Sequence, residues 1–186
     1  FRSSEVKTLA TRPNIFSVLQ LKYHPMVKEL KEKLDPLKNH EVEMDISVYR
    51  DPPYYAGWKG TLTRSGGILF NLGIHYFDLL VHLFGTPTSV GDINYTPKTA
   101  SGSFAGKNFT CNWRVSTDER RDNQRRVFKI DGVAYNFSSK DNLAYENLHR
   151  DVYRDLLEGK GITPAEALPA IELIENLYKK AEVPFV

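Results

Sequence analysis

Residues 66–85 read GGILFNLGIHYFDLLVHLFG, and this stretch decides the fold. Its apolar residues cover nearly every direction around a helix axis, which predicts a helix buried against a sheet. Gly85, with Pro87 shortly after it, ends the helix. Three polar residues within it, Asn71, His75 and Asp78, fall at i, i+4 and i+7 and therefore share one face.

His75 is the candidate acid–base residue of this polar face. Burying an unpaired polar group costs about 1–3 kcal/mol, so these side chains are expected either to pair or to line a cavity. An imidazole with an ordinary pKa of about 6.5 can take or give a proton near neutral pH. A core histidine with an ordinary hydrogen bond is the alternative that the spacing leaves open. His82 lies seven residues further on, but no third ligand is near and no metal site is expected.

Before this helix, the apolar run 15–21 predicts a short strand, and Pro25 opens a predicted helix over 26–34. Lys22 and His24 lie between the two. Loops at strand ends often hold ligand contacts, and a helix N-terminus favours anions, so both residues are candidate binding residues. An ordinary strand-to-helix turn is the alternative.

Residues 41–49 alternate charged and apolar side chains, the pattern of a half-buried strand. The stretch 50–67 has no periodicity and predicts a functional loop. In it, Tyr55 and Lys59, beside Tyr54 and Trp58, could stack on a ring and pair with a carboxylate or phosphate. Aromatic side chains that cover the core are the alternative.

The remaining chain predicts a sheet and two helices. The expected strands are 89–96, 99–105, 109–116, 126–130 and 134–137, and Asp131-Gly132 predicts a hairpin between the last two. Helices are expected over 143–157 and 164–182, the second behind a capping box of Thr163 and Glu166. His149 on the first is another candidate contact, although a structural role is favoured. The fold class is α+β, an open, mostly antiparallel sheet with helices packed on one face.

Composition excludes several classes of protein. The 186 residues carry a net charge of +2, so no nucleic-acid partner is expected, and the basic stretch 120–126 is interpreted as a solvated hairpin loop. One cysteine, Cys111, excludes an internal disulfide framework and suits a reducing cytoplasm. No signal peptide and no membrane-spanning run are expected. Motifs for dinucleotide binding, phosphate-binding loops, zinc hydrolases and serine hydrolases do not occur.

Three segments together resemble a known family. They are SGGILFNLGIHYFDLL at 65–80, LQLKYHP at 19–25 and YYAGWKG at 54–60. Their order is similar to that in the glucose-fructose oxidoreductase, inositol dehydrogenase and rhizopine catabolism (Gfo/Idh/MocA) oxidoreductases, in particular the bacterial UDP-N-acetylglucosaminuronate 3-dehydrogenases of surface polysaccharide (lipopolysaccharide) synthesis. Many relatives have Asp at the position of Asn71. Asn there resembles this subgroup rather than enzymes of inositol or simple hexoses.

The resemblance implies roles for the candidate residues. His75 would handle the proton of the substrate hydroxyl, and Asn71 would orient the sugar. The implied substrate contacts are Lys22, His24, Tyr55, Lys59 and His149. The implied fold is the dihydrodipicolinate-reductase-like C-terminal domain, which in the family follows a Rossmann domain. Residues 15–186 would form this substrate-binding and oligomerisation domain, and residues 1–14 would be the end of the Rossmann domain.

The sequence departs from the family pattern at two motifs. It has neither the glycine fingerprint nor the Glu-Lys-Pro motif with the second catalytic residue. NAD or NADP is therefore expected to serve a longer enzyme, and this stretch alone is expected to bind no dinucleotide and to be inactive. A homo-oligomer through the sheet face is expected as well. The alternatives are a dehydrogenase of a free sugar or cyclitol, and a non-catalytic dimerisation module.

Overall fold

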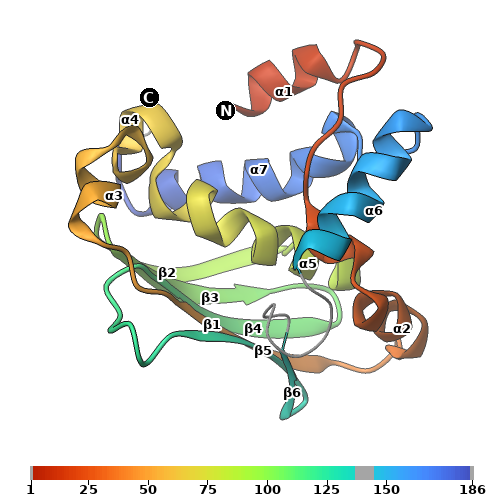
Figure 1. Ribbon diagram of the computed structural model, residues 1–186. Helices are drawn as coiled ribbons and strands as arrows, with labels where there is room; N and C mark the ends of the chain where they lie inside the picture. Colours follow the sequence, from red (N-terminus) through yellow and green to blue (C-terminus); the bar gives the residue numbers. More distant parts are fainter. Residues whose placement is uncertain (1, 137–144, 185–186) are drawn as a thin grey trace.

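The computed structural model describes residues 2–136 and 145–184 and has the predicted α+β architecture (Figure 1). Six strands form one open sheet in the order β2-β3-β4-β1-β5-β6. The strands are β1 (His40–Ser47), β2 (Ser89–Tyr95), β3 (Thr99–Ala105), β4 (Phe109–Ser116), β5 (Arg125–Ile130) and β6 (Val133–Asn136). The helices are α1 (Ser3–Leu9), α2 (Pro25–Lys33), α3 (Pro52–Ala56), α4 (Leu62–Ser65), α5 (Ile74–Phe84), α6 (Tyr145–Leu157) and α7 (Pro164–Lys180).

The sheet is mostly antiparallel, as predicted. Only β1 and β4 pair in parallel, with Val42 opposite Cys111, while the other neighbouring strands run antiparallel. The predicted hairpin between β5 and β6 is confirmed, and both of its turn residues have positive φ, 51° at Asp131 and 80° at Gly132. A two-residue turn with positive φ at both positions matches the right-handed twist of the strands.

The core lies between the sheet and a layer of helices on one of its faces (Figure 1). Phe77 of α5 packs edge-on against Trp113 of β4, with ring centroids 5.2 Å apart. On α7, Ile174 and Leu177 are fully buried. This helix begins at the predicted capping box, in which the Thr163 hydroxyl accepts from the Glu166 amide and the Glu166 carboxylate accepts from the Thr163 amide. The expectation of helices on one face is confirmed.

The strand predicted over residues 15–21 is wrong. Ser17 makes a single bridge to Ile162, its N–H donating to the carbonyl at 2.7 Å. The chain then turns into a 3-10 helix, η1 (Gln20–Tyr23). Leu19 and Leu21 are buried beneath the helices rather than in the sheet. A short apolar run fits a buried strand and a buried helical turn equally well, so periodicity alone could not separate them.

Two other segments have more structure than the sequence indicated. Residues 50–67 form α3, the 3-10 turn η2 (Trp58–Gly60) and α4 instead of an irregular loop. The polar start of the chain contains α1, whose Val6 is buried and whose Lys7 ammonium lies 2.7 Å from the Glu172 carboxylate of α7. The first helix therefore packs against the last one.

The segment Leu62–Phe84 is long and apolar enough to cross a membrane, and no other helix within the described residues passes that test. Its most apolar part is 61% buried inside the fold. Such burial is typical of the core helix of a globular domain.

Candidate active site

The helix that carries His75 begins with a π-helical turn, η3 (Leu69–Gly73), which the sequence did not indicate. π turns within α-helices are frequent at functional sites. Gly73 ends the turn, and a Cβ there would lie 2.8 Å from the ring of Phe77, closer than side chains approach. Any larger residue there, immediately before Ile74 and His75, would push the fully buried Phe77 ring out of its place in the core.

His75 is largely enclosed, and its imidazole is uncharged near neutral pH. Burial lowers its pKa, and the nearby charge of His149 on α6 lowers it further. The buried Nδ1 atom of His75 has no hydrogen-bond partner in the described part of the chain. An uncharged imidazole in this setting can accept a proton from a bound hydroxyl. The structure thus brings together two of the predicted site residues, His75 and His149.

One turn beyond His75, Asp78 forms a buried ion pair with Lys22 of η1. The Lys22 Nζ lies 2.8 Å from Asp78 Oδ1, and the side chains are 14% and 2% exposed. Burial raises the pKa of Asp78 to about 6, although Lys22 opposes the shift. The structure brings Lys22 to the helix of His75, but its charge is paired within the chain.

His24 and His82 have other neighbours. His24 is buried and caps α2, its Nδ1 accepting from the Met26 amide at 3.2 Å. Burial lowers the pKa of His24 and also that of His82, where Lys22 and Lys31 add to the effect. In the described residues no three or more His, Cys, Asp or Glu side chains are grouped to hold a metal ion.

Asn71 lies within η3 and reaches the segment before the helix. Its Nδ2 donates to the carbonyl oxygens of Lys59 at 2.8 Å and Gly67 at 2.9 Å, and lies 2.7 Å from Ser65 Oγ. The Lys59 ammonium is exposed, 5.8 Å from the centroid of the Trp58 ring. Ser65 was not identified from the sequence, because no local pattern predicts a hydroxyl shared between two turns.

Tyr55 contacts residues at one end of the sheet. Its hydroxyl donates to the Thr117 carbonyl at 2.6 Å, and the Lys98 ammonium lies 4.9 Å from its ring centroid. These contacts attach α3 to the residues just before β3 and just after β4. The prediction that Tyr55 contacts a substrate stays a prediction, as do those for His24, Lys22, Lys59 and His149.

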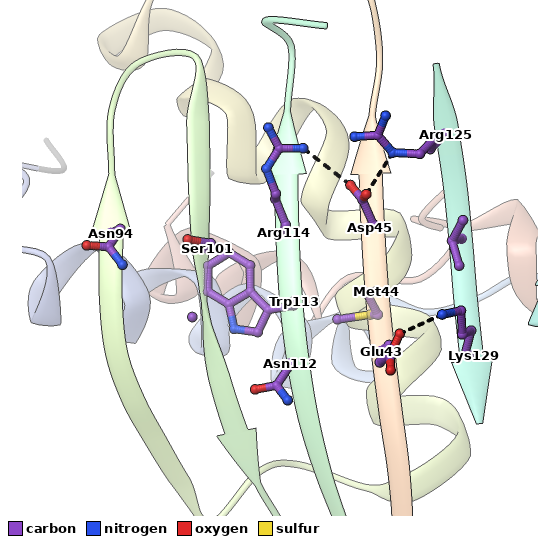
Figure 2. A pocket seen from close by; sticks show the side chains of 12 residues that line it. Glu43, Met44, Asp45, Asn94, Ser101, Asn112, Trp113, Arg114, Arg125 and Lys129 are labelled. Carbon is purple, nitrogen blue, oxygen red and sulfur yellow. Dashed lines mark hydrogen bonds and ion pairs between the residues drawn. The ribbon is translucent and has the colours of Figure 1, made fainter. Parts of the chain in front are cut away.

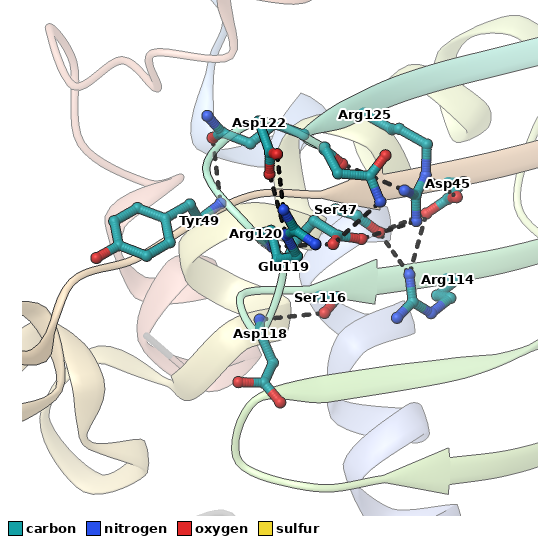
Figure 3. Close-up of polar contacts among 12 residues, drawn as sticks. Asp45, Ser47, Tyr49, Arg114, Ser116, Asp118, Glu119, Arg120, Asp122 and Arg125 are labelled. Carbon is teal, nitrogen blue, oxygen red and sulfur yellow. Dashed lines mark hydrogen bonds and ion pairs between the residues drawn. The ribbon is translucent and has the colours of Figure 1, made fainter.

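The face of the sheet opposite the helices is polar. Side chains from the neighbouring strands β1 to β5 line a shallow cavity of about 660 Å³, and Figure 2 shows how they lie. Asp45 of β1 pairs with Arg125 at 2.8 Å and Arg114 at 3.4 Å, and Arg125 also reaches Glu119 at 3.0 Å (Figure 3). These residues alternate with buried ones along β1 and β4. The same alternation in residues 41–49 predicted a half-buried strand from the sequence.

A family model described as the GFO/IDH/MocA C-terminal domain matches residues 38–118, which run from β1 through α5 to β4. Residues 38–118 therefore resemble a GFO/IDH/MocA C-terminal domain. The chain is similar to the WlbA (WbpB) dehydrogenase from Thermus thermophilus in complex with NAD and UDP-GlcNAcA, at 30% identity and a TM-score of 0.80. That match covers 96% of this chain and 60% of the dehydrogenase, so the chain spans less than two thirds of its relative.

More distant structures share the fold of this chain. The WlbA dehydrogenase from Bordetella pertussis, in complex with NADH and UDP-GlcNAcA, has a TM-score of 0.72 at 19% identity, covering 90% of this chain and 61% of that one. Myo-inositol 2-dehydrogenase from Lactobacillus plantarum has a TM-score of 0.69 at 13% identity, with coverages of 95% and 66%. The fold class predicted from the sequence is confirmed.

Proposed function

We propose that this chain is the substrate-binding domain of an NAD(P)-dependent oxidoreductase that acts on a nucleotide sugar, at the 3-hydroxyl of UDP-N-acetylglucosaminuronate. The observation that carries the proposal is the enclosed, uncharged imidazole of His75, with a buried Nδ1 that has no partner among the described residues. The 30% identity to the Thermus thermophilus dehydrogenase supports the substrate class.

In this mechanism His75 accepts the proton of the sugar hydroxyl as its C–O bond becomes a carbonyl. The lowered pKa of His75 keeps the imidazole ready to accept, since the uncharged form dominates at neutral pH. A bound nicotinamide would take the hydride. This sequence has no glycine-rich dinucleotide motif. We therefore assign the cofactor to a separate nucleotide-binding domain, which would correspond to the part of the relatives outside the match. Residues 1–14 would be the end of that domain.

The test is NAD reduction by the intact enzyme with UDP-N-acetylglucosaminuronate, comparing wild type, His75→Ala and His82→Ala. Loss of a general base is expected to lower kcat by about 10²–10⁴-fold in the His75 variant. His82 lies on the same helix two turns further on and has no assigned role, so its variant is the matched control. Activity that survives in His75→Ala would contradict the acid–base assignment.

The alternatives give different outcomes in the same assay. A dehydrogenase of free sugars or cyclitols would reduce NAD with myo-inositol or a hexose and not with the nucleotide sugar. A non-catalytic module would reduce NAD with none of them. The similarity to myo-inositol 2-dehydrogenase is one of fold alone and favours neither alternative.

We further propose that the sheet face opposite the helices contacts a second copy of the chain. This face is polar, because it is lined by Glu43, Asp45, Arg114 and Lys129. The contact is therefore supported by charge complementarity rather than by burial of apolar surface. Mixed positive and negative charges on one face can complement themselves across a two-fold axis. Gel filtration is expected to give a dimer or larger species that dissociates at high salt, and a clean monomer at low salt would argue against the contact.

A further inference from the structure

The segment 57–67, just before the buried helix, presents Trp58 and Lys59 side by side, and both are exposed. Trp58 is 56% exposed and is one of the most exposed large apolar residues of the described chain. Beside it is the Lys59 ammonium, 5.8 Å from the ring centroid. A flat ring next to a positive charge is suited to a ligand that has both a planar group and a negative charge.

The backbone of this segment is held tightly although its tip is exposed. A Cβ at Gly60 would lie 2.5 Å from the Cα of Tyr55, so the two turns pack too closely for any other residue. At the other end, the Tyr178 hydroxyl donates to the Gly66 carbonyl at 2.6 Å. Between these points, Asn71 reaches the Lys59 and Gly67 carbonyl oxygens.

The hydrogen-bond partners fix which atom of the Asn71 amide faces the segment. Carbonyl oxygens only accept, so the side-chain nitrogen must face Lys59 and Gly67, because the flipped amide would set oxygen against oxygen. The Ser65 hydroxyl gives its hydrogen to the Lys59 or Thr61 carbonyl, and its oxygen accepts from the Gly67 amide at 3.2 Å. Both amide hydrogens of Asn71 are therefore used within the chain. Only its Oδ1 is left for a ligand, and only as an acceptor.

We propose that Asn71 is a positioning residue, which ties segment 57–67 to the start of the His75 helix and so holds Trp58 and Lys59 where they meet the ligand. A carboxylate at this position would place a negative charge against two carbonyl oxygens. The carbonyl oxygens of segment 57–67 therefore favour Asn over Asp at this position, in addition to any preference of the substrate. The inference rests on the proposed function only in taking the ligand to be the substrate.

The test of the contact is hydrogen–deuterium exchange of residues 57–67 in the intact protein without substrate. Asn71→Asp is expected to speed exchange there by about ten-fold, the effect of weakening one or two hydrogen bonds that hold the segment. Asn71→Ala, which removes the bonds without adding a charge, is expected to give a smaller increase. Asn176→Asp, an exposed change on α7, is the matched control and should leave the segment unchanged.

Two further readouts separate positioning from general loss of structure. When pH falls, the aspartic acid of Asn71→Asp takes a proton and can donate one bond, so its exchange should return toward wild type measured at the same pH. In the enzyme assay, Asn71→Asp should raise KM for the nucleotide sugar, and adding Lys59→Ala should cost little more, because both changes act through one segment.

The outcomes distinguish this proposal from the proposed function. Unchanged exchange in Asn71→Asp, or additive effects of Asn71→Asp and Lys59→Ala on KM, would overturn the positioning role and leave Asn71 as a direct ligand contact. Faster exchange without NAD reduction by any protein would retain the positioning of the segment and reject the dehydrogenase.

Discussion

Two aspartates, Asp78 beneath the helices and Asp45 on the outer face of the sheet, are both paired with cations, yet their pKa values shift in opposite directions. At Asp78, burial dominates and raises the pKa to about 6 in spite of Lys22. At Asp45, burial is the largest single influence and also raises the pKa. Hydrogen bonds from Ser47 and Arg125 and the positive charges of Arg125 and Arg114 lower it. Together these outweigh burial, so the net pKa of Asp45 is lowered.

The difference lies in the number of donors around each carboxylate. Asp78 has a single cation, Lys22, and is 2% exposed. Asp45 accepts from Ser47, Arg114 and Arg125 and is 35% exposed. An ion pair with one partner in an enclosed site does not recover the cost of removing both charges from water. A half-exposed carboxylate with several donors keeps its charge easily.

Breaking the enclosed pair is expected to have the largest effect. Lys22→Met leaves a buried carboxylate without its cation and should lower the free energy of unfolding by about 3 kcal/mol at pH 8, measured by urea denaturation. The loss should shrink at pH 5, where Asp78 takes a proton. Adding Asp78→Leu to Lys22→Met should restore most of the stability. A Lys22→Met protein as stable as wild type would show that the ion pair does not contribute to stability.

The pH dependence of stability gives an effect of similar size. A folded-state pKa above the unfolded value means that the folded protein binds the extra proton, so stability falls as pH rises between about 4 and 6. Relative to Asp78→Asn, wild type should lose about 3 kcal/mol over this range. The lowered pKa of Asp45 works in the opposite sense, its contribution being lost as pH falls. Urea denaturation of both proteins at several pH values in this range measures how the difference between their unfolding free energies changes with pH. A difference that does not change with pH would contradict the prediction.

The smallest effect is expected on the outer face. Arg125→Met removes two partly exposed pairs, to Asp45 and Glu119, and should cost about 0.5–1 kcal/mol. This loss should fall in 1 M NaCl because exposed pairs are screened by salt. The effect of Lys22→Met should hardly respond to salt. Equal salt sensitivity in the two variants would remove the distinction between the sites.

Elements with a clear local signal were predicted well from the sequence. The strands from residue 89 onward are bounded by turns, and the Asp131-Gly132 hairpin and the Thr163 capping box have mechanisms that involve only neighbouring residues. The buried helix was predicted from its apolar run. The start predicted for the helix over 143–157 lies outside the described residues, and its described part, α6, ends at Leu157 as expected.

The features that could not be predicted from the sequence depend on contacts between distant segments. The run 15–21 was assigned to a strand because its length fits one, while its actual neighbours are helices. For Asn71, the spacing predicts the helix face on which it lies but not the carbonyl oxygens to which it donates, which belong to residues twelve and four positions earlier. Lys22 is a candidate ligand contact by its place before a helix, and no local pattern indicates that Asp78, 56 positions away, is its partner.

The central position of β1 has a consequence for synthesis. Both of its neighbours, β4 and β5, come much later in the chain. A ribosome adding about 5–20 residues per second needs roughly 4–16 seconds for the roughly 80 residues between the ends of β1 and β5. During that interval Val42, Met44 and Ile46 belong to a strand with two open edges. We therefore expect the nascent chain to be most exposed to chaperones in this interval, and the closure of the long loops around β1 to slow folding of the domain.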